Sequence, residues 1–90
     1  MRDHEFEWDD RKSASNLRKH NVSFETARLA FSDPAWFELP DPDPDEDRWQ
    51  RICMHDGVLY VVIYVERRYR NRIISARKAN QYEQGLYQNR

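Results

Sequence analysis

Six basic side chains occur within residues 67–78, a segment whose other residues are typical of β-strands. They are Arg67, Arg68, Arg70, Arg72, Arg77 and Lys78. Arginine carries a planar, permanently charged guanidinium group that can hold a phosphate through two hydrogen bonds. Tyr60, Tyr64 and Tyr69 are close by in the sequence, and their rings could stack on nucleobases. The segment therefore indicates a nucleic-acid-binding surface. A solvated sheet face, or arginines paired with the acids of the first half of the chain, is an equally good interpretation.

The direction of these side chains depends on the regularity of the strand. Arg70 and Arg72 point to one face, because alternate residues of a strand share a face. Ser75 and Arg77 have the opposite parity, so they point to the other face unless a β-bulge intervenes. In either case the end of the strand concentrates guanidinium groups.

A second candidate group lies near the N-terminus. Lys12, Asn16 and Lys19 recur at helical spacing and therefore share one face of a helix. His20 follows them and could exchange a proton near neutral pH. Cations are also routine at helix C-termini, because they interact favourably with the helix dipole. Spacing alone therefore favours an ordinary polar helix face.

A third candidate pair, Glu83 and Tyr87, lies one helical turn apart near the C-terminus. A carboxylate and a phenol could orient or exchange a proton, although spacing alone favours a plain surface position. The three histidines and the single cysteine lack the spacing of metal ligands, and two glycines cannot form a phosphate-binding loop. We therefore predict neither a metal nor a cofactor, and we expect Cys53 to fill the core.

The length of the chain limits the number of domains, and its charge distribution indicates the kind of surface that these groups form. Ninety residues form one small domain, residues 1–90. The net charge is −1, but residues 1–47 hold 13 acids and 6 bases (−7), and residues 48–90 hold 9 bases and 3 acids (+6). This separation indicates a basic surface on a nearly neutral protein. Five of the acids lie in the proline-spaced segment 40–47, which we expect to be a loop far from any site.

Three further features concern the location of the protein. The longest apolar run, Val58–Val65, is far shorter than the roughly 20 residues of a membrane helix. The first residues contain no apolar signal sequence. One cysteine cannot form an internal disulfide. We therefore expect a cytoplasmic protein with no membrane partner.

Hydrophobic periodicity predicts the elements that must position these groups. The predicted strands are Glu5–Trp8, Ala35–Leu39, Trp49–His55, Val58–Val65 and Arg70–Ala76. The predicted helices run from a cap at Asp9 or Asp10 to His20, with Asn21 as a left-handed stop, from the cap Ser23 to Asp33-Pro34, and over residues 79–89. Asp56-Gly57 marks a hairpin turn. Hairpin-linked strands with helices to one side predict an α+β domain with an antiparallel sheet, in which Val58–Val65 is central.

The order of these motifs resembles the BrnT family of type II toxins. The N-terminal similarity consists of Phe6-Glu7-Trp8-Asp9, Lys12, Asn16-Leu17, Lys19-His20, Val22-Ser23-Phe24 and Ala27. The C-terminal similarity consists of Arg72-Ile73-Ile74-Ser75-Ala76-Arg77-Lys78-Ala79, Glu83 and Tyr87, and Asp33-Pro34 and the acidic segment lie between them. The resemblance covers nearly the whole chain in order. Gly85 is a mild departure, because it weakens the last helix.

The resemblance implies a RelE-like fold: an antiparallel β-sheet packed against two N-terminal helices and one C-terminal helix. It implies a metal-independent endoribonuclease that cleaves mRNA, free or on the ribosome, and arrests translation. It also implies neutralisation by a BrnA-like ribbon-helix-helix antitoxin, through which alone the toxin would reach operator DNA. The catalytic candidates that it implies are Lys19, His20, Arg72, Arg77, Lys78, Glu83 and Tyr87. The RNA-binding candidates are Lys12, Arg67, Arg70 and Ser75.

Such a ribonuclease needs a base for the RNA 2′-hydroxyl, cations at the phosphate and a proton donor for the leaving oxygen. We expect Arg72 and Arg77, assisted by Lys78, to stabilise the phosphate; one such donor can contribute about 2.7–4 kcal/mol. The candidate bases are His20 and Glu83, and the candidate donors are Tyr87 and Lys19. Two alternatives stay open: a non-catalytic module that inhibits a target such as DNA gyrase, and a nontoxic interaction protein.

Overall fold

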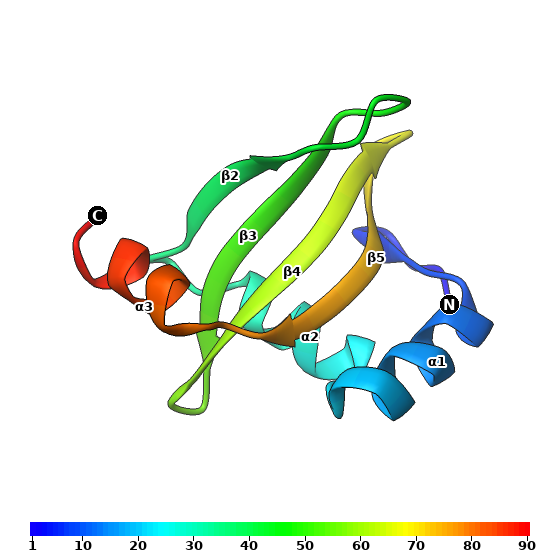
Figure 1. The fold of residues 1–90 in the computed structure, drawn as a ribbon. Coiled ribbons are helices and arrows are strands. Elements are labelled where there is room, and N and C mark those ends of the chain that lie inside the picture. The colour runs from blue at the N-terminus through cyan, green and yellow to red at the C-terminus, as the bar shows by residue number, and fades with distance from the viewer.

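The computed structural model describes all residues, 1–90, as a curved five-stranded sheet with three helices (Figure 1). The elements, in chain order, are β1 Phe6–Glu7, α1 Asp10–His20, α2 Phe24–Phe31, β2 Phe37–Asp41, β3 Arg48–His55, β4 Val58–Arg67, β5 Arg70–Lys78 and α3 Gln81–Gln88. This order of strands and helices is the predicted one. The spatial order of the strands is β1-β5-β4-β3-β2, so the predicted central place of β4 is confirmed.

Local signals set the ends of the two N-terminal helices. The Asp9 carboxylate accepts hydrogen bonds from the backbone N–H groups of Arg11 (2.8 Å) and Lys12 (3.1 Å), and so caps α1. Asn21 adopts the left-handed conformation (φ 56°) and ends this helix. Ser23 caps α2. These predictions are confirmed because capping depends only on residues that are neighbours in the sequence.

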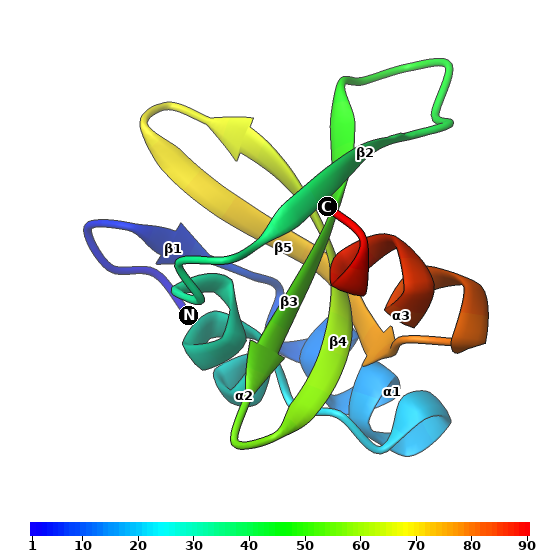
Figure 2. The ribbon, with the colours of Figure 1, turned by 90° about the vertical axis from the view of Figure 1, so that its left-hand side faces the viewer.

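Two cores hold α2 and α3 against opposite faces of the sheet. α2 covers one face over a core of 13 buried residues, none of which belongs to α1. In this core the Phe31 ring makes T-shaped contacts with the rings of Phe6 and Tyr64, with ring centroids 5.1 and 4.8 Å apart. α3 covers part of the other face, over a smaller core that includes Ile52 and Val61. Figure 2 shows α3 on the near side of the sheet. None of the three helices has the length and apolar composition of a membrane-spanning segment.

The predicted fold class is wrong in its sheet and in its helix placement. We expected a RelE-like, purely antiparallel sheet with the helices to one side. The sheet is mixed instead, because β1 pairs in parallel with β5, through Phe6 opposite Asn71 and Glu7 opposite Arg72. α3 also lies on the face opposite to α2. Hairpin spacing predicts only pairings between consecutive strands, and β1 reaches its partner from the other end of the chain.

A β-bulge changes the face of the residues at the end of β5. The pairing of β5 with β4 skips one residue, Ile74, between Ile73 and Ser75. Because of this extra residue, Ser75 and Arg77 lie opposite the same alternate residues of β4 as Arg72 does. The bulge therefore brings to one face side chains that regular alternation would have separated.

Candidate functional site

The outer edge of β5 is covered first by a strand and then by a helix. β1 pairs with β5 only at Asn71 and Arg72, and α1 lies along the rest of this edge. Asn16 of α1 is buried, with 6% of its surface exposed. Its Oδ1 accepts a hydrogen bond from the Ala76 N–H (3.2 Å), and its Nδ2 donates to the carbonyl oxygens of Ala76 (2.8 Å) and Val22 (2.9 Å). This side chain therefore forms the hydrogen bonds with the Ala76 N–H and carbonyl groups that a further strand at this edge would otherwise form.

A small polar pocket of about 180 Å³ lies at this junction, and we call it the α1–β5 pocket. The residues that line it are Lys12, Ser15, Asn16, Lys19, His20, Ile74 and Ser75. The Ser75 hydroxyl donates to Asn16 Oδ1 at 3.2 Å, at the bulge. The structure thus brings together four predicted site residues from opposite halves of the chain: Lys12, Lys19, His20 and Ser75.

The α1–β5 pocket is cationic at its rim. The side chains of Lys12, Lys19 and His20 are exposed, and no acidic residue lines the pocket. No lysine of the protein takes part in an ion pair within 4.0 Å, so both ammonium groups are free. The pKa of Asp9 is lowered, mainly by its hydrogen bond from the Lys12 backbone and in part by the Lys12 charge, so one carboxylate lies near this rim. Cations that outnumber the nearby carboxylates attract an anion such as a phosphate.

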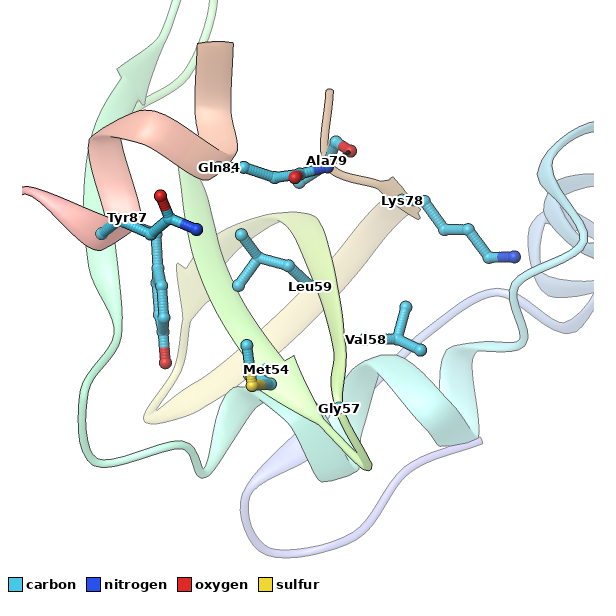
Figure 3. Close-up of a pocket in the computed structure, with 9 residues that line it drawn as sticks. Met54, Gly57, Val58, Leu59, Lys78, Ala79, Gln84 and Tyr87 are labelled. Carbon is cyan, nitrogen blue, oxygen red and sulfur yellow. Dashed lines mark hydrogen bonds between the residues drawn. The ribbon is translucent and has the colours of Figure 1, made fainter. Parts of the chain in front are cut away.

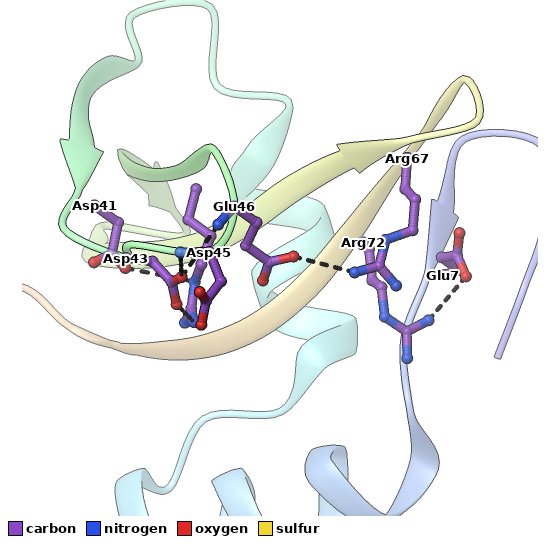
Figure 4. A network of polar contacts seen from close by, with 8 residues as sticks. Glu7, Asp41, Asp43, Asp45, Glu46, Arg67 and Arg72 are labelled. Atoms are coloured by element: carbon purple, nitrogen blue, oxygen red, sulfur yellow. Dashed lines mark hydrogen bonds and ion pairs between the residues drawn. The ribbon is translucent and has the colours of Figure 1, made fainter.

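Most of the predicted arginines are engaged with other groups of the protein. Arg67 Nη2 lies 3.2 Å from Glu46 Oε2, and Arg72 Nη1 lies 2.8 Å from Glu7 Oε2 (Figure 4). Arg70 Nε donates to a backbone carbonyl of the N-terminal segment at 2.6 Å. These contacts hold the arginines in place and reduce the positive potential that they present to a ligand.

The acidic loop between β2 and β3 lies beside the basic hairpin, so our expectation that it would be far from the candidate residues is wrong. Glu46 contacts Arg67, and Asp43 accepts a hydrogen bond from Arg48 Nη1 at 2.8 Å (Figure 4). The reason is the antiparallel pairing: Arg48, which follows the loop, lies opposite Val65, which precedes the β4–β5 turn. Both connections therefore lie at the same end of the sheet.

Arg77 and Glu83 join β5 to α3. Arg77 Nη1 and Nη2 each donate to one Glu83 carboxylate oxygen at 2.7 Å, and the Asn80 N–H donates to Glu83 at 2.9 Å. The hydrogen bonds from Arg77 lower the pKa of Glu83, although burial opposes the change. A carboxylate that accepts three hydrogen bonds is a weak proton acceptor. Glu83 therefore suits the docking of α3 better than general-base catalysis.

Lys78 and Tyr87 line a different pocket, of about 440 Å³, between α3 and the β3–β4 hairpin (Figure 3). The Tyr87 hydroxyl donates to Asp33 Oδ2 at 2.6 Å, and this hydrogen bond raises the pKa of Tyr87. Tyr87 and His20 do not line a common pocket. Tyr87 ties α3 to the loop after α2, and a raised pKa makes it a poorer proton donor.

The sequence analysis did not predict two features of the pocket. Asn16 was recognised on the helix face but not as the residue that holds α1 to β5. The sequence does contain an indication of this role, because asparagine is a poor helix former and yet occupies the middle of α1. Ile74 was not recognised as a bulge residue. The structure contains no group of three or more histidine, cysteine or acidic side chains that could hold a metal ion.

Comparison with known proteins adds one match. Residues 8–83 match the family described as "Ribonuclease toxin, BrnT, of type II toxin-antitoxin system". The matched span contains the α1–β5 pocket and the Arg77–Glu83 ion pair, and it ends before Tyr87. A search among curated proteins finds no match.

Proposed function

Since the chain belongs to the BrnT family of ribonuclease toxins of type II toxin–antitoxin systems, we propose that it is an endoribonuclease that cleaves mRNA and so arrests translation and growth. We also propose that the chemistry takes place in the α1–β5 pocket. One set of converging side chains carries this proposal: Lys12, Lys19, His20 and Ser75. The set combines cations for a phosphate with an imidazole that can accept and donate a proton.

RNA supplies its own nucleophile, the 2′-hydroxyl group next to the scissile phosphate. In the proposed reaction, neutral His20 accepts the proton of this hydroxyl, whose oxygen then bonds to phosphorus. The bond from phosphorus to the 5′-oxygen breaks, and the Lys19 ammonium donates a proton to that oxygen. The products are a 2′,3′-cyclic phosphate and a free 5′-hydroxyl. Side chains supply the base, the acid and the positive charge, so the proposed reaction needs no metal ion.

Contacts within the protein support His20 and Lys19 over the other two candidates. Glu83 already accepts three hydrogen bonds, and the Tyr87 hydroxyl is bonded to Asp33 in another pocket. His20 and Lys19 are exposed in the same pocket. We assign Lys12 to the phosphate, because its ammonium is free of ion pairs.

The remaining basic residues have a supporting role in the proposal. They guide the RNA backbone towards the pocket: Arg67, Arg70, Arg72, Arg77 and Lys78. The bulge favours this role, because Arg72, Ser75 and Arg77 share one face of β5. Arg72 and Arg77 keep part of their side chains exposed, 25% and 33%, so each can contact RNA while its carboxylate partner holds it.

The type II class implies an antitoxin partner. We propose that this partner is a BrnA-like ribbon-helix-helix protein, and that the toxin is held at operator DNA only through it. An acidic segment of the antitoxin that covers the free lysines would block the pocket, since complementary charge favours such a contact. We propose that the toxin acts in the cytoplasm, where mRNA is found.

Primer extension tests the proposal. Purified toxin is incubated with an mRNA, in EDTA without ribosomes and in Mg²⁺ with translating ribosomes, and new 5′ ends are mapped. We expect discrete cleavage by the native chain, no cleavage by His20→Ala, and no cleavage where the substrate carries a 2′-deoxy nucleotide at the cut. Intact mRNA in both reactions with the native chain would overturn the proposal.

A further inference from the structure

The turn between β4 and β5 contains residues that its geometry disfavours. Arg68 and Tyr69 form a two-residue loop between the paired residues Arg67 and Arg70, and both have positive φ (50° and 69°). This is the arrangement of a type I′ turn, which prefers asparagine, aspartate or glycine because bulky side chains are strained there. The β3–β4 hairpin of the same protein has the preferred pair, Asp56-Gly57.

Nothing within the protein compensates for these residues. The Tyr69 side chain is fully exposed, and it makes no hydrogen bond or aromatic contact. Arg68 is exposed and forms no ion pair within 4.0 Å. Neither the turn nor the core therefore explains why an arginine and a tyrosine occupy this tip. Strained residues that make no contact with their own protein point to a contact with another molecule.

We propose that this tip, Arg68 and Tyr69, is a second RNA contact outside the α1–β5 pocket, with Tyr69 stacked on a base and Arg68 on a phosphate. The inference rests on the proposed function. An exposed aromatic ring beside a free guanidinium is the combination that binds single-stranded nucleic acid without strict sequence preference.

The position of the tip on the sheet supports RNA as the ligand. β5 runs from the tip to the α1–β5 pocket, and Arg70, Arg72 and Ser75 lie along one of its faces. At about 3.3 Å per residue, the path from Arg70 to Ser75 is on the order of 17 Å. One single strand of RNA laid along β5 can therefore contact both the tip and the pocket. The tip would then fix the position of the strand relative to the reacting phosphate.

Replacement of the tip by the favoured turn separates this role from a structural one. The double variant Arg68→Asn, Tyr69→Gly should raise the melting temperature, since it relieves the turn. The same variant should weaken binding to a short, mixed-sequence, single-stranded RNA with 2′-O-methyl groups by about fivefold or more, as expected for the loss of one base stack. Fluorescence anisotropy measures this binding without cleavage, because the nucleophile is blocked. Tyr69→Trp should keep the affinity of the native chain.

Leu29→Ala serves as the matched control, because Leu29 is exposed on α2, at the opposite face of the sheet. Its RNA affinity should equal that of the native chain. Native affinity in the double variant, with cleavage of unmodified RNA retained, would overturn the inference and leave the proposed function standing. Loss of antitoxin binding with native RNA affinity would also overturn it, since the tip would then be a protein contact. A native chain that neither binds nor cleaves RNA would overturn both proposals.

Discussion

The Arg77 guanidinium donates a hydrogen bond to each carboxylate oxygen of Glu83, both at 2.7 Å, across the junction of β5 and α3. Glu83 is 6% exposed and also caps its own helix through Asn80. Arg77, which the sequence predicts as a residue that stabilises the RNA phosphate, therefore also attaches the C-terminal helix to the sheet. Loss of function on substitution of Arg77 has to be divided between these two roles.

Arg77→Ala should destabilise the protein by about 1–3 kcal/mol, because it leaves the Glu83 carboxylate buried and without its charged partner. Addition of Glu83→Gln should recover part of this loss, since a neutral amide tolerates the site better. Urea denaturation of the two variants measures both effects. If Arg77→Ala has native stability and yet loses RNA cleavage, the ion pair contributes little and Arg77 acts directly on RNA.

Stability should fall in acid partly through the same ion pair. The pKa of Glu83 is lowered below its ordinary value of 4.5, so the folded state favours the carboxylate form. Its contribution is fully present above pH 4.5 and is lost as the pH falls through the lowered pKa. Glu83→Gln should therefore flatten the decrease in stability below pH 4.5. If the free energy of unfolding of this variant falls with pH as in the native chain, other carboxylates cause the loss of stability in acid. Asp3, whose pKa is lowered to about 2, is one such carboxylate.

His20→Ala should reduce the rate of RNA cleavage by about 10²–10⁴-fold, the usual contribution of a general base. Its melting temperature should stay native, because the His20 side chain is exposed and forms no hydrogen bond with the rest of the protein. Single-turnover cleavage assays measure the rate. Arg18→Ala is the matched control, since Arg18 is an exposed cation of α1 that does not line the pocket. Equal rates in the two variants would remove His20 from the mechanism.

Lys12→Ala should weaken RNA binding and make it less dependent on salt. Each lost contact with a phosphate of a single strand should reduce the slope of log affinity against log salt concentration by about 0.7. Anisotropy titrations at several salt concentrations measure this slope. Arg11→Ala removes a neighbouring exposed cation that lies outside the pocket, and it should leave the slope closer to the native value. The same slope for both variants would mean that the pocket has no special affinity for phosphate.

Asn16→Ala should cost about 1–3 kcal/mol of stability, because the N–H and carbonyl groups of Ala76 lose their partner. Cleavage should fall as well, since α1 would no longer hold Lys19 and His20 beside Ser75. Chemical denaturation and cleavage at low temperature, where the variant is folded, measure the two effects. Leu17→Ala, an exposed neighbour in α1, should change neither. Full activity in a destabilised Asn16→Ala chain would show that the pocket keeps its geometry without this tie.

Prediction from the sequence was best where the physical causes are local. Helix caps at Asp9 and Ser23, the left-handed stop at Asn21 and the Asp56-Gly57 turn depend on a few consecutive residues, so they could be identified without the fold. The acidic loop shows the limit of this approach. Its composition correctly predicted a loop over residues 42–47, whereas Pro40 and Asp41, also expected in the loop, belong to β2. Its position beside Arg67 depends on the pairing of β3 with β4.

The sequence by itself determined the order of the elements, the chemical groups available and the resemblance to a toxin family. The tertiary structure alone decided which of those groups meet. The parallel pairing of β1, the placement of α3 on the second face and the bulge at Ile74 all arise from contacts between distant segments. Such contacts leave no periodic signal in either partner. For the same reason, charge patterning singled out the arginines of β5, of which Arg72 and Arg77 are paired with carboxylates, whereas the cations that line the α1–β5 pocket are lysines of α1 without ion pairs.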